Sequence, residues 1–254
     1  MIPVLQIGAL SGQPLPSAQR FRIAVFGAEV QRIRPETDIY ALPDPEEQMV
    51  DPVALLAAGA ARGLFSGCAG VAGKISAHAE RLADTRPDIV EWSLLLEGVD
   101  LGALRLLANM LACRRFDSAE IVADGCVGGA VTQSAMLSYP SCIPPQEFTF
   151  VHDPPAKSHS ERGVRLFFAD EPDDVTLDLV IASLDTWGNI MMAGGYDGDS
   201  GANAFANKAA LEESCVVGVS LMVSGVNELM FSPVVNLARR VHALYAPLER
   251  LELA

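Results

Sequence analysis

The stretch DIVEWSLLLEGVDLGALRLLANMLACRRFDSAEIVAD, residues 88–124, contains the three segments that decide the fold. Residues 88–98 form an apolar run with the length of a buried strand, and residues 118–124 form a shorter strand-like run. Between them, apolar side chains recur at the spacing of one helix face: Leu101, Leu104, Leu107, Met110 and Leu111. A strand, a helix over 99–116 and a second strand are typical of a right-handed parallel crossover, so this stretch predicts a βαβ unit.

The segments before this unit predict further elements of the same half. Residues 4–8 and 21–34 have strand-like patterns, and in the second run alternate apolar side chains should face the core: Phe21, Ile23 and Val25. Helix-like runs cover residues 52–64 and 69–84. Asp51 is the expected N-terminal cap of the first of these helices.

The chain after residue 146 has a different pattern. Short connections between strand-like runs favour antiparallel pairing. The expected strands cover residues 147–152, 164–170, 175–185, 189–195 and 215–225. The expected helices cover residues 202–214 and 232–248, the second opening with Ser232 and Pro233.

These segments together predict an α+β (mixed α/β) fold with two halves. Residues 1–145 should form an α/β half that contains the βαβ crossover. Residues 146–254 should form an antiparallel α+β half with two helices. The alternative is that both halves belong to one continuous domain.

The composition restricts the class of protein. Half of the 254 residues are apolar, and the formal net charge is −14. An acidic chain without a basic stripe is not expected to bind nucleic acid. No apolar run reaches the roughly 20 residues that a bilayer span needs, and no secretory signal is recognisable, so we expect a cytoplasmic protein without a membrane partner. The apolar surplus favours burial of surface in a homo-oligomer.

The five cysteines are widely spaced and include no C-x-x-C pair. This spacing argues against a disulfide framework and against a structural zinc site. No G-x-G-x-x-G follows the first strand and no P-loop occurs, so the sequence leaves the cofactor unassigned. The stretch GCAGVA, residues 67–72, is similar to GCVGGA, residues 125–130, and either chance or a duplication explains the similarity.

Cys126 is the first candidate for catalysis, because it follows the strand-like run 118–124 where a helix-like run begins. Free backbone N–H groups and the positive end of a helix dipole at such a junction favour a thiolate and can bind an anionic group. The candidate ligand-binding residues of this turn are Gly125, Gly128 and Gly129. In the alternative interpretation, the glycines serve only the turn and Cys126 packs as a small apolar residue.

A second glycine-rich segment, AGGYDGDSGANAF, covers residues 193–205. Its candidate ligand-binding residues are Gly195, Tyr196, Asp197, Asp199 and Asn203. Some of these are spaced like calcium ligands, but Lys208 stands where a bidentate Glu should close the loop, so no metal is expected. The segment either binds a ligand or forms only a hairpin end that caps the next helix.

His152 and Asp178 complete the candidate catalytic set. His152 precedes the polar loop 153–163, where it is either a base oriented by Asp153 or part of a solvated loop. Asp178 lies among apolar residues of the expected strand 175–185, and it is of interest only if it faces the core. On a regular strand, Asp185 would face the opposite side.

The sequence therefore favours an enzyme that acts on a small polar metabolite by thiol-based nucleophilic or acid–base chemistry. Its site should lie between the halves, near the turns 124–130 and 194–203. The alternative is a non-catalytic oligomeric protein that binds a small ligand or forms an assembly.

Overall fold

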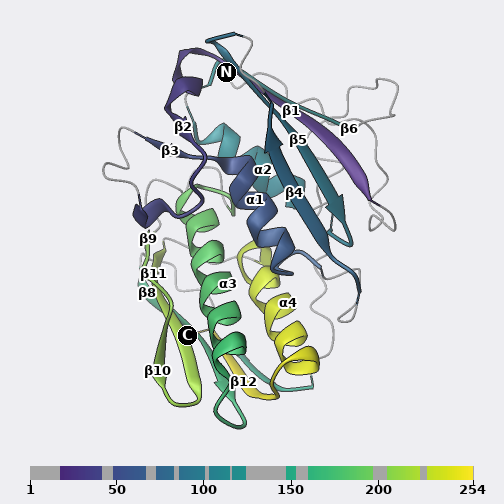
Figure 1. Cartoon of the computed structure of the whole chain (residues 1–254). Helices are drawn as coiled ribbons and strands as arrows, with labels where there is room; N and C mark the ends of the chain where they lie inside the picture. The colour runs from purple at the N-terminus through teal and green to yellow at the C-terminus, as the bar shows by residue number, and fades with distance from the viewer. Residues whose placement is uncertain are drawn as a thin grey trace.

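A computed structural model describes residues 18–41, 48–66, 73–82, 86–100, 103–114, 116–123, 147–152, 160–196, 205–223 and 228–253 (Figure 1). The elements of the first half are β1 (Gln19–Phe26), η1 (Ala28–Arg32), β2 (Ile33–Arg34), η2 (Ile39–Ala41), β3 (Met49–Val50), α1 (Pro52–Ala61), β4 (Ser76–Arg81), β5 (Ile89–Glu97), α2 (Ala103–Ala112) and β6 (Ser118–Ala123). Those of the second half are β7 (Thr149–His152), β8 (Ser160–Phe168), α3 (Asp174–Met192), β9 (Phe205–Ala206), β10 (Ala210–Glu213), β11 (Val216–Val223), α4 (Glu228–Leu244) and β12 (Leu248–Leu253). None of the helices in these ranges is long and apolar enough to cross a membrane.

The first sheet has the strand order β4-β5-β1-β6. β5 and β6 are each antiparallel to β1, so they are parallel to one another and α2 connects them. The predicted crossover is therefore confirmed, with β1 inserted between its two parallel strands. The chain order β1-α1-β4-β5-α2-β6 in this sheet is the split βαβ, or ferredoxin-like, topology.

The second sheet repeats this topology. Its order β10-β11-β8-β12-β7 places β8 between β11 and β12, and both neighbours are antiparallel to it. The chain order β8-α3-β10-β11-α4-β12 thus matches that of the first half, with β7 added in parallel beside β12. The predicted α+β fold, with a mainly antiparallel second sheet and two helices, is confirmed.

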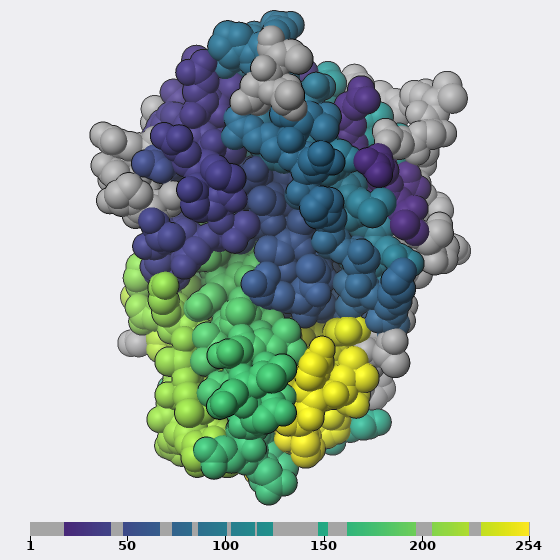
Figure 2. Space-filling view, in the orientation of Figure 1, coloured from purple at the N-terminus to yellow at the C-terminus, as the bar shows by residue number. Residues whose placement is uncertain are grey.

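The helices of the two halves pack against one another. α1 contacts α2 and α3, and α3 contacts α4, so one hydrophobic core includes residues of both halves. Figure 2 shows the purple-to-blue first half resting on the green-to-yellow second half. The sequence of α1, PVALLAAGAA, has no charged residue, as expected of a helix that is covered on several sides.

A reciprocal pair of contacts joins the halves at the ends of α1 and α3. Each helix ends in a turn with a glycine in the left-handed region, Gly63 at φ +85° and Gly194 at φ +83°. The carbonyl of the next residue accepts a hydrogen bond from an asparagine on the second helix of the other half. Asn236 of α4 donates to Leu64 at 3.2 Å, and Asn109 of α2 donates to Gly195 at 2.7 Å.

Some predicted elements are wrong. Residues 69–84 contain β4 instead of a helix: His78 and Glu80 are exposed while Ala77 and Ala79 pack against the core, which is the period of a strand. The predicted helix over 202–214 is replaced by β9 and β10, and all residues of β10 are exposed, as in an edge strand.

The largest error concerns the expected strands 175–185 and 189–195, which form one helix, α3. Asp173 caps it by accepting the N–H of Thr176 at 2.7 Å. Its buried side chains recur at helical spacing, as in Val180, Leu184 and Trp187, and this burial outweighs the β-branched composition that suggested strands.

Other boundaries differ less. The strand expected over 21–34 ends at Phe26, where Gly27 at φ +128° leads into η1. α4 begins at Glu228, before Pro233, and ends at Leu244, so that only Leu248, the last residue of the helix expected over 232–248, belongs to β12. The expected strand 4–8 lies outside the described residues, as does the proposed boundary at residues 145 and 146.

Candidate functional site

Most of the sequence-predicted site residues lie outside the part of the chain that the structure describes. These are Cys126, Gly125, Gly128, Gly129, Asp197, Asp199 and Asn203. The turn predicted at 124–130 therefore stays a prediction, and of the turn predicted at 194–203 the structure describes only Gly194, Gly195 and Tyr196.

His152 and Asp178 lie on two other elements of the second half, β7 and α3. His152 ends β7, where its backbone is paired with Leu253 of β12. Asp178 is exposed near the start of α3, whereas Gly195 follows the other end of that helix. The interest in Asp178 depended on a strand and a buried carboxyl, and the structure has neither.

Gly195 and Tyr196 are buried at the boundary between the halves. The Gly195 carbonyl accepts the Asn109 bond, and the Cys113 thiol donates to the Gly194 carbonyl at 3.9 Å. The Tyr196 ring lies 6.1 Å from the Trp187 ring. Gly195 thus contacts the first half, Tyr196 packs on Trp187 within the second half, and their role in ligand binding stays a prediction.

A cluster of polar side chains lies at another part of this boundary. Asp185 and Asn189, one turn apart on α3, face the segment that ends in η2 and the segment between β9 and β10. We call Asp38, Tyr40, Asp185, Asn189 and Lys208 the junction group. Its members come from three separate parts of the sequence, and their contacts bring α3 of the second half to η2 of the first half.

Direct contacts hold the junction group together. Asp185 Oδ1 accepts the Ala209 N–H at 2.7 Å, which places Lys208 beside this carboxylate. Lys208 Nζ lies 3.5 Å from Asp38 Oδ2 and 5.2 Å from the centroid of the Tyr40 ring. Lys208 therefore forms an ion pair with Asp38, and its charge also acts on Asp185.

The environment shifts the proton affinities of two members. Burial, with smaller contributions from the Asp185 and Asp38 charges, raises the pKa of Tyr40 to about 12. Burial also raises the pKa of Asp185, against the lowering effects of the Ala209 N–H and the Lys208 charge. The Tyr40 hydroxyl therefore remains a proton donor at neutral pH, and the Asp185 carboxyl binds a proton more readily than an ordinary aspartate.

Asn189 adds an unused acceptor. The side chain is 4% exposed, and its Nδ2 donates to the Thr37 carbonyl at 3.3 Å. Its Oδ1 is buried and has no hydrogen-bond partner among the described residues. A buried amide oxygen of this kind usually has a donor, either from the protein or from a bound molecule.

Sequence reasoning missed most of the junction group. It considered Asp185 only as a strand residue facing away from Asp178, and Lys208 only as a misfit in a calcium loop. The signal that could have found Asp185 and Asn189 is their spacing of four on a helix, together with Met192 on the same face. Asp38 and Tyr40 stand in a segment without a pattern, so no local signal connects them to α3.

The chemistry of the group is that of hydrogen bonding and proton transfer. Oxygen acceptors outnumber cationic donors, so the group suits a ligand that donates hydrogen bonds. Within the described ranges, no three His, Cys, Asp or Glu side chains are grouped closely enough to hold a metal ion.

Comparisons with known proteins give little further information. No protein-family model matches the sequence, and no curated protein matches it. One similar solved structure is the crystal structure of pitrilysin, with 8% sequence identity and a TM-score of 0.19. The match covers 91% of this chain and 37% of that pitrilysin chain, and a likeness of this quality supports no argument about fold or activity.

Proposed function

We propose that the protein is an enzyme that acts on a small polar metabolite, and that the junction group binds this metabolite between the two halves. The observation that carries the proposal is that Asp185 and Tyr40, two half-buried titratable groups, lie close enough for the Asp185 charge to act on Tyr40, and that both pKa values are raised. Groups with shifted pKa values gather at functional sites more often than elsewhere.

Each member of the group has a role in this proposal. Asp185 exchanges a proton with the metabolite, because a carboxyl with a raised pKa serves as a general acid or base closer to neutral pH. Tyr40 donates a hydrogen bond, and the Asn189 Oδ1 accepts one. Lys208 and Asp38 hold each other beside the Tyr40 ring and define one side of the group.

A thiol remains part of the proposal. Cys126 is the sequence-based candidate for nucleophilic or acid–base chemistry, and its test is the rate of alkylation. One cysteine labelled much faster than the others by iodoacetamide near neutral pH supports a thiol enzyme, whereas uniformly slow labelling favours a non-catalytic ligand-binding or assembly-forming protein. A cytoplasmic location and a homo-oligomer also belong to this proposal, and light scattering tests the second.

The Ala209 amide gives a direct test of the junction group. Its N–H donates to Asp185 Oδ1, so its proton chemical shift follows the charge on that carboxyl. We expect a titration midpoint above the ordinary value of 3.8 and a shift of the same resonance when ethanolamine, glycine or glycerol is added as a probe.

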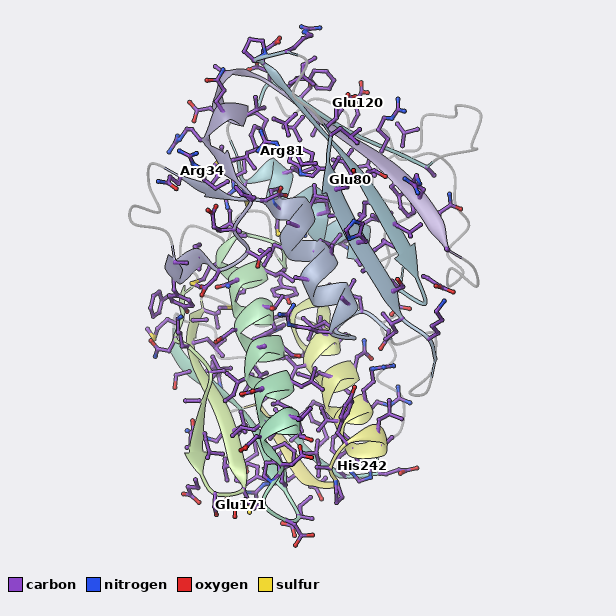
Figure 3. The ribbon with its side chains drawn as sticks, in the orientation of Figure 1. Arg34, Glu80, Arg81, Glu120, Glu171 and His242 are labelled. Carbon is purple, nitrogen blue, oxygen red and sulfur yellow. The ribbon has the colours of Figure 1, made fainter. Side chains whose placement is uncertain are left out.

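Matched variants complete this test. Asp185→Asn should abolish both the titration and the response to the probes. Glu171→Gln should leave both unchanged. Glu171 is exposed, precedes the start of α3 and lies at the lower end of the molecule in Figure 3, whereas Asp185 lies in the second half of that helix. An Asp185 that titrates at the ordinary value and an Ala209 amide that responds to none of the probes would contradict the proposal.

A further inference from the structure

Arg114 follows the C-terminal end of α2, next to Cys113, whose thiol contacts the Gly194 carbonyl. Its Nε is buried and has no hydrogen-bond partner among the described residues. No carboxylate in those ranges forms an ion pair with it. A cation at a helix C-terminus is normally a solvated complement to the helix dipole, and the buried Nε does not fit that role.

The surroundings of Arg114 disfavour its positive charge, so an anion bound nearby would be stabilising. Burial lowers its pKa most, the neighbouring Cys113 raises it, and the positive charge of Arg32 lowers it. Arg32 has its own counter-charge, since its Nη1 lies 2.5 Å from Glu29 Oε2. The positive charge of Arg114 is therefore the one that the described residues leave unmatched at this place.

The equivalent place in the other half provides a comparison within the same chain. There, Arg240 of α4 lies beside Gly63, the turn glycine that corresponds to Gly194. Its Nη1 donates to the Gly73 carbonyl at 3.3 Å, so the protein itself supplies an acceptor. Arg240 follows Asn236 by four residues, as Cys113 follows Asn109, so the position equivalent to Arg240 holds Cys113, and Arg114 comes one residue later. Arg240 shows that a guanidinium at such a turn can have a backbone acceptor, which the Arg114 Nε lacks among the described residues.

We propose that Arg114 binds the oxyanion group of a small ligand, a carboxylate or a phosphate, at the end of α2. A guanidinium presents its N–H donors in a planar fork that matches two oxygens of such a group, and the bond is charge-assisted. Arg32 and the neighbouring Cys113 both lie close enough to act on the charge of Arg114. This site is separate from the junction group and does not depend on it.

Binding of inorganic phosphate and of acetate tests the proposal, with chloride used to keep the ionic strength constant. In the wild-type protein, we expect millimolar phosphate or acetate to shift the Nε–H resonance of Arg114, and the more effective of the two identifies the kind of oxyanion. Arg114→Gln should weaken the binding about tenfold or more, because a charge-assisted bond is lost. Arg34→Gln removes an exposed arginine on β2 and should leave binding unchanged.

Alkylation of Cys113 provides a second, independent readout. Iodoacetate carries a carboxylate and iodoacetamide does not, so Arg114 should make Cys113 prefer iodoacetate more than the half-buried Cys215 does. Phosphate should suppress this preference, and Arg114→Gln should remove it. If Arg114→Gln fails to fold, the wild-type preference and its suppression by phosphate still decide the question.

Two results would overturn the proposal. The first is an Arg114 resonance that neither anion shifts while Cys113 shows the same reagent preference as Cys215. The second is equal binding of phosphate by the wild-type protein and Arg114→Gln, which would place the anion elsewhere.

Discussion

Replacing Asp51 by alanine should destabilise the protein through two separate losses. Asp51 is 3% exposed, and its Oδ1 accepts the N–H groups of Val53 and Ala54 at 2.9 Å as the cap of α1. Its Oδ2 accepts the indole N–H of Trp92, on β5, at 2.8 Å, and Trp92 is 1% exposed. One side chain thus joins the start of α1 to the centre of the first sheet.

The expected loss of stability is the sum of these two losses. Loss of the cap costs about 1 kcal/mol. The indole N–H left without an acceptor costs about 1–3 kcal/mol, because it is buried. We therefore expect Asp51→Ala to lower the free energy of unfolding by about 3 kcal/mol in urea denaturation, followed by circular dichroism.

A double-mutant cycle separates the contributions. Trp92→Phe removes the indole donor, so Asp51→Ala should cost less in that background, with a coupling of about 1–2 kcal/mol. The pKa of Asp51 is raised, mainly by burial, so the folded state keeps this proton to a higher pH than the unfolded state. The stabilisation that comes from this proton is full below the unfolded pKa and is lost as the pH rises through the folded pKa. The cost of Asp51→Ala should therefore be largest in acid. A cost below about 0.5 kcal/mol, the size of an ordinary surface substitution, or strictly additive costs would refute this reasoning.

Further predictions concern the boundary between the halves and one turn. Asn109→Ala and Asn236→Ala should each lower the free energy of unfolding by about 1–2 kcal/mol, since each leaves a carbonyl of the opposite half without its donor; denaturation curves that overlay the wild type would contradict this. In an absorbance titration at alkaline pH, Tyr40 should ionise at about 12, and Asp185→Asn should lower that pKa by removing a negative charge and not raise it. Gly98→Ala should cost about 1–3 kcal/mol, because residue 98 has φ +66° and the new Cβ would lie 2.1 Å from a backbone carbonyl oxygen; an unchanged melting temperature would show that the turn relaxes freely.

The elements of the first half that could be predicted each show one clear period in their apolar residues. β5 alternates between buried and half-buried residues, and α2 buries Leu104, Leu107 and Met110 on one face, as the 88–124 stretch indicated. α3 could not be predicted in the same way, because β-branched residues and Gly188 inside its sequence weaken the helix signal. Packing against α1, α4 and β11 outweighs this local preference.

The repeated topology is accompanied by a repeated residue pattern, but GCAGVA and GCVGGA are not that pattern. GCAGVA follows α1, within the first half, whereas GCVGGA follows β6, which completes that half, so the two stretches do not occupy equivalent places. The sequences that start at the two equivalent turn glycines, Gly63 and Gly194, instead share a spacing of one aromatic residue and two further glycines: Phe65, Gly67 and Gly70 after the first, and Tyr196, Gly198 and Gly201 after the second.

The members of the junction group were not predicted from the sequence. The sequence predicted a site between the halves, which stays a prediction, and the junction group contains none of the residues predicted for it. The junction group depends on side chains from η2, α3 and the segment after β9, which only the folded chain brings together. Contacts between such distant segments have no period or motif, so a single sequence does not reveal them.

Because each half offers the other the same kind of contact, we expect that two copies of this chain can exchange their halves. The first half of one copy presents to another copy the same asparagine and the same turn carbonyl that it presents to its own second half. A swapped dimer would therefore contain every contact of the closed monomer, and the two forms would differ mainly in how the connection between β6 and β7 runs. Shortening that connection should trap the swapped form, because its ends could no longer reach within one molecule.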